Sequence, residues 1–279
     1  MNRITLCAVA AASLALAGAL LPSRSVAEPR DEAAFTYYSY SFNSPGNAYG
    51  PWYVENFSNR DYFHKGSVGF EFENESTLDR LNPHTGQYIV LDNYYDWTPG
   101  FFTYASVGVG TAQPFPSSSL FLEGDFHVLR SAPLLIGLGG DVTRDFTGVS
   151  ERYLSIGPTY YWPHFNASLR YHPLTASNGN SSAATDVALE YGDEGRSLTD
   201  LTIEAGGSLL AVQSNGISTL APGERNFSFD LEHKQWVSSH GGYRVGVTYA
   251  HLTDRATGNL IYTQHGIVLG AFTSFGTNR

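Results

Sequence analysis

The sequence predicts an all-β fold: one transmembrane β-barrel built from antiparallel, up-and-down strands. Three observations predict it. Apolar and polar residues alternate along many segments, short turns alternate with longer polar loops, and 17 Phe, 18 Tyr and 4 Trp accompany only 15% charged residues, against roughly 25% in an ordinary soluble domain. Hydrophobic residues make up 42% of the chain, which excludes disorder. A helical membrane bundle is excluded because there is only one long apolar run.

Residues 1–27 are predicted to be a cleaved signal peptide. Arg3 supplies the charged start, residues 6–21 form the apolar core, and the small residues 25–27 fit a signal peptidase site. We therefore expect cleavage before residue 28 and one barrel domain over residues 28–279. The alternative is an uncleaved anchor helix, which Pro22 disfavours because the apolar run ends short of the roughly 20 residues that span a bilayer.

The predicted mature chain is acidic and has no cysteine. Removal of residues 1–27 takes away Arg3, Arg24 and Cys7 and leaves 14 basic and 26 acidic side chains, a net charge of −12. An exported chain without disulfides must gain its stability from backbone pairing and packing. The acidic balance argues against binding to nucleic acid.

Strict alternation of apolar and polar residues, as in Phe165–His172, predicts strands with one apolar and one polar face. Fourteen candidate strands follow, each about 9–14 residues long. Strands of globular proteins average about 5–6 residues, whereas a tilted membrane-spanning strand needs about 9–11. The predicted strands are 34–43, 50–60, 64–74, 86–96, 101–110, 119–130, 133–144, 149–162, 164–172, 184–194, 198–211, 226–236, 242–253 and 262–275. The alternative is twelve strands, with 50–60 or 198–211 not crossing the membrane.

The predicted connections alternate in length, as they do in outer-membrane barrels with short periplasmic turns and longer external loops. Tight turns are expected at 98–100, 131–133, 163–164 and 238–241, and long polar loops at 75–86, 111–119, 175–184 and 213–225. An even number of strands places both termini on one side of the membrane, which we expect to be the periplasm. The expected location is therefore the outer membrane.

Aromatic residues cluster at the predicted strand ends, where a bilayer interface favours them. These residues are Tyr37–Tyr40, Tyr94, Tyr95, Trp97, Phe101, Phe102, Tyr160–Trp162, Trp236 and Tyr243. A soluble lipocalin-like barrel or a sandwich is the competing interpretation. It is disfavoured because such folds rarely join so many long strands and would not present the apolar row Leu120, Leu122, Phe126 and Val128 outward.

A series of aromatic and glycine placements resembles the YaiO-like outer-membrane barrels over most of residues 34–275. The resemblance lies in Tyr38-Ser39-Tyr40, the strand of Trp52, Asp92-Asn93-Tyr94, Phe102–Gly108, Pro114-Phe115-Pro116, and Tyr153–Pro158 ahead of Tyr160-Tyr161-Trp162. It implies an outer-membrane barrel associated with surface-polysaccharide machinery, and it implies no catalytic residue.

The polar rows of the strands predict a charged lumen with nine acids, three strong bases and two histidines. The lumen-lining candidates are Glu71, Glu73, Glu123, Asp125, His127, Arg170, His172, Asp186, Glu190, Glu204, Asp230, Glu232, Lys234 and Arg244. Burying a lone ion costs several kcal/mol, so these groups must be paired or hydrated. Two alternatives stay open: salt bridges that close the lumen, or an acidic, water-filled pathway that prefers cations.

The sequence offers no constellation for catalysis or metal binding, so we expect no enzyme activity and no cofactor. Asp125 could orient His127, but no Ser nucleophile is identifiable with them. The segment Tyr262–Gly266 has a superficial likeness to a phospholipase segment, yet alternation directs His265 outward and no Ser follows. The nine histidines lack paired ligand spacing, including His233.

Three classes of function remain, in this order of preference. The first is a pore, or a component in the transport or export of surface polysaccharide or small polar solutes. The second is a structural or surface-interaction barrel with a closed lumen, and the third is a lipid-modifying enzyme of the outer membrane. Expected partners are outer-membrane lipid and lipopolysaccharide, the barrel assembly machinery and surface-polysaccharide export components.

Overall fold

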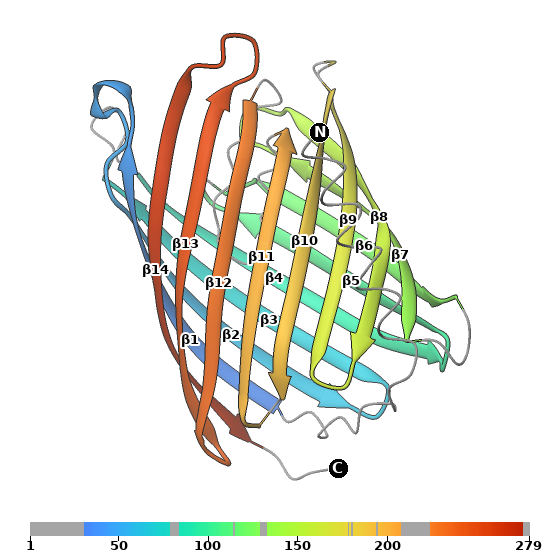
Figure 1. Cartoon of the computed structure of the whole chain (residues 1–279). Helices are drawn as coiled ribbons and strands as arrows, with labels where there is room; N and C mark the ends of the chain where they lie inside the picture. The colour runs from blue at the N-terminus through green and yellow to red at the C-terminus, as the bar shows by residue number, and fades with distance from the viewer. Residues whose placement is uncertain are drawn as a thin grey trace, which may run out of the picture.

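A computed structural model describes residues 31–78, 84–113, 115–128, 133–177, 179, 181–193, 195–207 and 224–275. In this part of the chain, fourteen antiparallel strands form one closed barrel, each strand pairing with its sequence neighbours and β1 pairing with β14 (Figure 1). The predicted signal peptide lies outside the described residues. Among the described residues, no helix is long and apolar enough to cross a membrane.

The strands run in sequence order around the barrel. They are β1 (Asp31–Asn43), β2 (Trp52–Phe63), β3 (Gly66–Thr77), β4 (His84–Thr98), β5 (Phe101–Gly110), β6 (Ser118–His127), β7 (Leu134–Arg144), β8 (Ser150–Trp162), β9 (Phe165–Ala176), β10 (Ser181–Asp193), β11 (Ser197–Gly207), β12 (Glu224–Ser238), β13 (Gly241–Asp254) and β14 (Leu260–Phe275). One short 3-10 turn, η1 (Pro45–Asn47), follows β1.

The prediction of fourteen strands is confirmed, and the alternative of twelve is wrong because β2 and β11 both pair along their length. The predicted loops 75–86 and 175–184 are wrong at their ends. Strand β3 runs to Thr77 and β4 begins at His84, while β9 runs to Ala176 and β10 begins at Ser181. Polar residues continue the hydrogen-bonded ladder at the end of β3, whereas β9 continues with Leu174 and Ala176 buried on the inner face. Residues 129–130 and 208–211 of two predicted strands lie outside the described residues.

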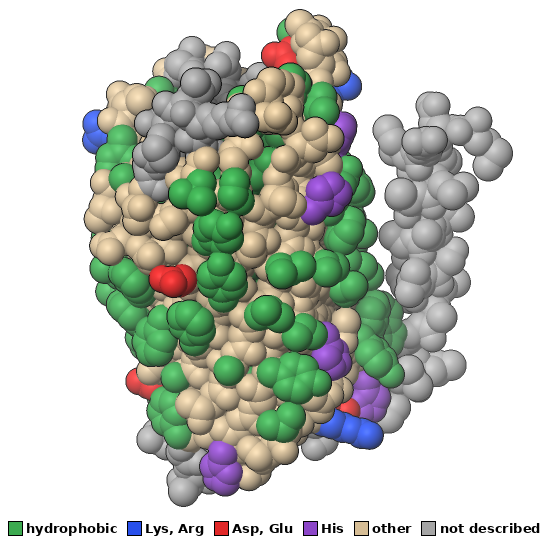
Figure 2. Space-filling model, turned by 90° about the vertical axis from the view of Figure 1, so that its left-hand side faces the viewer, with side chains coloured by type: hydrophobic (Ala, Val, Ile, Leu, Met, Phe, Trp, Pro, Cys, Tyr) green, Lys and Arg blue, Asp and Glu red, His purple; other side chains and the backbone are tan. Residues whose placement is uncertain are grey.

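The strands have an apolar outer face. Leu120, Leu122 and Leu138 are 56%, 57% and 54% exposed, and Leu154 and Ile267 are 59% and 53% exposed. Figure 2 shows hydrophobic side chains over much of the visible wall with few charged ones between them. Lipid solvates such a surface, whereas water would not stabilise it. The row predicted to face outward on β6 therefore does so.

The connections differ between the two ends of the barrel. Described turns of two residues join β2 to β3, β4 to β5, β8 to β9 and β12 to β13 at the end where Asp31 pairs with Phe275. Longer connections, such as 44–51, 111–117 and 255–259, lie at the opposite end. The predicted alternation of connections is thus observed at these positions. We call the two ends the terminal end and the loop end.

Part of the interpretation of the aromatic residues is wrong, because alternation directs some of them into the barrel. Tyr38 and Tyr40 are only 4% and 1% exposed and pack with Trp52 on the inner face, and Trp236 is 9% exposed and packs on Phe272. In any aromatic run on a strand, alternate rings must face the lumen. In contrast, Trp97, Tyr161 and Tyr243 are exposed, as a membrane interface requires.

Candidate functional site

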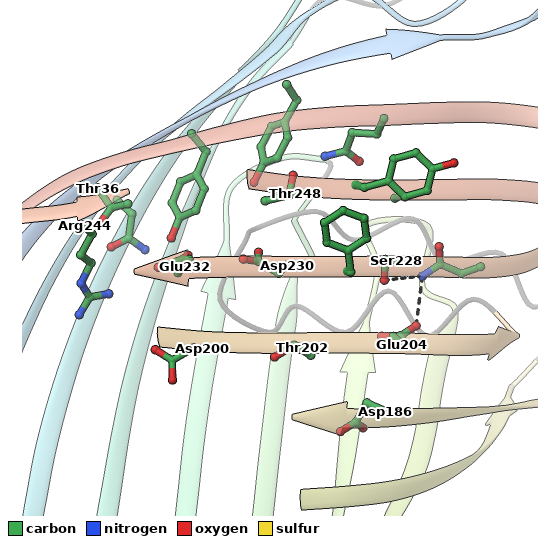
Figure 3. Close-up of a pocket in the computed structure, with 18 of the residues that line it drawn as sticks. Thr36, Asp186, Asp200, Thr202, Glu204, Ser228, Asp230, Glu232, Arg244 and Thr248 are labelled. Carbon is green, nitrogen blue, oxygen red and sulfur yellow. Dashed lines mark hydrogen bonds between the residues drawn. The ribbon is translucent and has the colours of Figure 1, made fainter. Parts of the chain in front are cut away.

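A polar cavity of about 380 Å³ lies inside the barrel, against β1–β3 and β8–β14. Figure 3 shows polar side chains of β10, β11, β12 and β13 along it. Its charged and titratable lining comprises six carboxylates, one guanidinium and one imidazole. These are Glu71, Asp186, Asp200, Glu204, Asp230, Glu232, Arg244 and His172. Acids on neighbouring strands meet here because inward rows of antiparallel strands lie side by side, as Asp200 and Glu232 do in register.

Neutral amides partner two of these acids and the neighbouring Glu73. The Asn56 amide donates to Glu71 and, over 3.0 Å, to Glu73. The Asn226 amide donates to Glu204 over 3.2 Å. These hydrogen bonds stabilise the carboxylates without cancelling their charge, so the cavity wall stays acidic.

A second cluster lies on the opposite part of the wall and is electrically balanced. The Arg170 guanidinium on β9 lies 3.1 Å from Glu123 and 3.3 Å from Asp125, both on β6. It also donates to the Thr159 hydroxyl over 3.0 Å and to the Gly157 carbonyl over 3.1 Å. Because all three charged side chains are less than 15% exposed, their mutual pairing replaces most of their hydration.

Glycine makes room for this cluster. A Cβ on Gly137 would come within 2.6 Å of the Arg170 guanidinium and 2.8 Å of the Asp125 carboxylate. The guanidinium therefore lies against the bare backbone of β7 on its way from β9 to β6. This explains why a glycine occupies an inward position on a strand, where it otherwise weakens pairing.

A third group of charges lies nearer the terminal end. Lys234 lies 2.5 Å from one carboxylate oxygen of Glu32, and Arg244 lies 3.2 Å from the other. The Lys234 ammonium also sits 4.5 Å from the ring centres of Trp236 and Phe272. A carboxylate shared by two cations is a strongly paired group, so this region contributes little free charge to the lumen.

The fourteen residues named from sequence divide between the cavity and the rest of the inner face. Seven line the cavity: Glu71, His172, Asp186, Glu204, Asp230, Glu232 and Arg244. The other seven lie on inward rows outside its lining: Glu73, Glu123, Asp125, His127, Arg170, Glu190 and Lys234. His172 contacts the Asp186 carboxylate, and the Asn166 amide donates a hydrogen bond to Glu190 over 2.6 Å.

Several inward charged residues were not predicted from the sequence. Arg60 lies 2.8 Å from Asp92 on the inner face, and Glu32 and Asp200 take part in the arrangements described above. The additional inward residues are Glu32, Arg60, Glu75, Asp92, Asp141, Glu151 and Asp200. Alternation could have found Arg60 and Asp200, which continue the rows of Asn56 and Glu204. Glu32 lies before the start of the predicted first strand.

His127 and His265, the two histidines considered for catalysis, lie on different strands and on opposite faces of the wall. His127 is at the end of β6, and the carboxylate beside it, Asp125, pairs with Arg170. His265 is exposed and lies on the outward row of β14 with Ile267, as predicted. Within the described ranges, no three His, Cys, Asp or Glu residues are arranged to hold a metal ion.

Comparisons with known proteins agree with this architecture. A family model described as YaiO membrane beta barrel domain matches residues 32–209. Among solved structures, the CymD monoaromatic hydrocarbon channel is 8% identical with a TM-score of 0.55, and the match covers 90% of each chain. A FadL homologue of Pseudomonas aeruginosa is 11% identical with a TM-score of 0.52, covering 89% of this chain and 91% of that one.

A structure described as bacterial polysaccharide outer membrane secretin is 9% identical with a TM-score of 0.50, covering 89% of this chain and 99% of that one. At these identities the likeness concerns the fold alone. A search of curated proteins finds no match. Because the family model spans more than half of the chain, this protein belongs to the YaiO membrane beta barrel domain family and is an outer-membrane β-barrel.

Proposed function

We propose that this barrel is a narrow outer-membrane channel for small polar solutes and that cations pass in preference to anions. One observation carries the proposal: the cavity inside the barrel is lined by six carboxylates and only one guanidinium. An inner wall of this kind serves no packing purpose, because apolar residues of similar volume would cost less to bury. It is suited to holding water and positive charge.

The distribution of partners supports cation preference. Glu123 and Asp125 share Arg170, and Glu32 shares Lys234 and Arg244, so these carboxylates are largely neutralised. Two of the cavity acids instead have amide partners, Asn56 on Glu71 and Asn226 on Glu204. A narrow wall of low dielectric constant focuses the field of such charges and raises the local concentration of cations.

The related structures support transport at the level of fold. One is described as a hydrocarbon channel and one as a polysaccharide secretin. A role in polysaccharide export is the finer form of our proposal, and the hydroxyl and carboxylate groups of the cavity are compatible with sugar rings. A lipid-modifying enzyme has the least support, because Asp125, the carboxylate beside His127, pairs with Arg170, and because His265 faces outward.

The closed, structural barrel is favoured by a separate observation. Tyr38, Tyr40, Trp52, Val54 and Val268 form a buried apolar cluster on the inner face beside the cavity. Such a cluster narrows the interior and stabilises β1 against its neighbours. If it seals the lumen, the protein carries no current.

We further propose the orientation and the route of assembly. The terminal end would face the periplasm, since export by an N-terminal signal peptide and short turns at that end agree with the usual arrangement. The apolar outer face contacts outer-membrane lipid and lipopolysaccharide, and Phe275 on the outer row of β14 is suited to recognition by the barrel assembly machinery.

Planar-bilayer recording tests the channel directly. Purified barrel inserted into a bilayer under a KCl gradient should give discrete conductance steps with a reversal potential displaced toward the potassium value. Displacement toward the chloride value would contradict the proposed selectivity. Absence of current at every voltage, with insertion verified by protease protection, would favour the closed barrel.

A further inference from the structure

Four buried polar atoms of residues that line the cavity lack a hydrogen-bond partner within the described part of the chain. They are the hydroxyl oxygens of Tyr40 and Thr248, the Nδ1 atom of His172 and the Nε atom of Arg244. Tyr40 is 1% exposed and His172 is 6% exposed. Buried polar groups of folded proteins are nearly always hydrogen-bonded, so partnerless ones that border the same cavity indicate a ligand.

Three of these atoms can accept a hydrogen bond, whereas the Nε atom of Arg244 donates one and suits a hydroxyl of the same solute. Tyr40 and Thr248 lie together over Gly266, where an added Cβ would come within 2.6 Å of the Tyr40 ring and 2.3 Å of the Thr248 hydroxyl. His172 lies on β9, and its Nε2 atom contacts the Asp186 carboxylate. A neutral imidazole that donates to Asp186 presents Nδ1 as an acceptor. The hydroxyl oxygens accept as well.

The remaining lining is also rich in acceptors. The six carboxylates accept hydrogen bonds and donate none, and Arg244 is the one guanidinium among the lining residues. Aromatic rings complete the wall: Tyr38 and Tyr40 are stacked with their centres 6.2 Å apart, and Tyr262 lies nearby. Aromatic faces attract organic cations, most strongly where water is excluded.

We propose that this cavity binds a small polar solute that carries a primary ammonium group. The ammonium donates three hydrogen bonds, which matches a wall of acceptors, and its charge matches the excess of carboxylates. A cavity of about 380 Å³ falls within the range of small-molecule sites. The inference deepens the proposed channel function and rests on it for its biological role, but the binding itself needs no conduction.

Glucosamine and N-acetylglucosamine test the inference, because they share a sugar ring and differ at one nitrogen, which is a primary ammonium in the first and an uncharged, acetylated amide in the second. Isothermal titration calorimetry on the full barrel in detergent, at pH 7 and low salt, should show glucosamine binding at least about tenfold more tightly. Tyr40→Phe keeps the ring and removes the hydroxyl, so it should weaken glucosamine binding by about tenfold. Thr248→Val is a second, nearly isosteric variant with the same expected direction.

Glu55→Gln is the matched control, because Glu55 is an exposed carboxylate on the outward row of β2. It should leave glucosamine binding unchanged. Equal affinity for both sugars, or unchanged glucosamine affinity in folded Tyr40→Phe and Thr248→Val proteins, would overturn the inference. A barrel that binds glucosamine selectively but carries no current upholds this site and contradicts the channel. A cation-selective barrel that binds the two sugars with equal affinity upholds the channel and contradicts this site.

Discussion

The Arg170 guanidinium on β9 lies 3.1 Å from the Glu123 carboxylate on β6, although β7 and β8 separate these strands in the barrel wall. The side chain crosses this distance along the inner surface, over the bare backbone of Gly137. The interaction therefore joins strands that share no backbone hydrogen bonds. Together with Asp125, it fixes the inner surface of this half of the barrel.

Replacing Arg170 by Met should destabilise the barrel by about 3–5 kcal/mol, because Glu123 and Asp125 would remain buried without their cation. Urea unfolding in detergent, followed by tryptophan fluorescence, measures the change. Arg255→Met is the control, since Arg255 lies exposed in the loop after β13. A triple variant with Arg170→Met, Glu123→Gln and Asp125→Asn should recover much of the loss. Equal midpoints for Arg170→Met and wild type would contradict the pairing.

The facing of the strands gives a second prediction. Leu169 is 40% exposed on the outer face of β9, and its neighbour Ser168 faces inward at nearly the same depth. Arginine at the bilayer midplane costs about 2–4 kcal/mol on the lipid face and much less in a hydrated lumen. Leu169→Arg should therefore lower the amount of folded protein in the outer membrane far more than Ser168→Arg does. Heat-modifiable migration on gels quantifies both, and equal losses would show that the facing is misread.

The strands could be predicted because membrane burial imposes alternation over a fixed length. The same cause sets the limit of the prediction. Beyond the lipid region the outer face need not be apolar. The alternation therefore does not predict that β3 continues to Thr77 or that β9 continues to Ala176. Hydrogen bonding to the neighbouring strand, which depends on the register of the whole barrel, decides those ends.

The candidate site could be predicted as a set of inward residues but not as a set of partners. Alternation gives the inward rows of β6 and β9, yet whether Arg170 reaches Glu123 or another acid depends on the curvature of the wall and on Gly137. The separation into a balanced cluster and an acidic cavity follows from those pairings. Inward aromatic residues such as Tyr40 were misassigned because ring chemistry suits both an interface and a core.

The loop between β13 and β14 should lose its order only in strong acid. The Thr257 backbone amide donates to Asp254 over 2.7 Å, and the Thr257 hydroxyl and the Ala256 amide donate as well. These hydrogen bonds, that of the Thr257 amide above all, lower the pKa of Asp254 below its usual value. A lowered pKa means that the loop hydrogen bonds are fully formed above the ordinary Asp pKa of about 3.9 and are lost as pH falls through the lowered value.

The Thr257 amide chemical shift, followed by NMR in detergent, should therefore titrate with a midpoint below about 3.9. Asp254→Asn keeps an acceptor oxygen but removes the titrating charge, so its Thr257 amide should show no such transition. A midpoint at or above the ordinary Asp value would contradict the geometry of this loop.

Neutralising two cavity acids should weaken cation selectivity. Asp230 and Glu232 lie on the inward row of β12 and line the cavity, so their charges contribute to the field inside it. The double variant Asp230→Asn with Glu232→Gln leaves four of the six cavity carboxylates and the Arg244 charge. The potassium-to-chloride permeability ratio should fall on the order of two- to threefold, because the focused field weakens with the charge that produces it.

The matched control neutralises two acids on the exposed outward row of β2, by Glu55→Gln with Asp61→Asn. Both double variants change the net charge of the protein equally, so a difference between them reports position rather than total charge. Reversal potentials under a tenfold KCl gradient give the ratio for each variant. If the control lowers the ratio as much as the cavity variant does, the selectivity arises from the overall charge of the protein and not from the cavity wall.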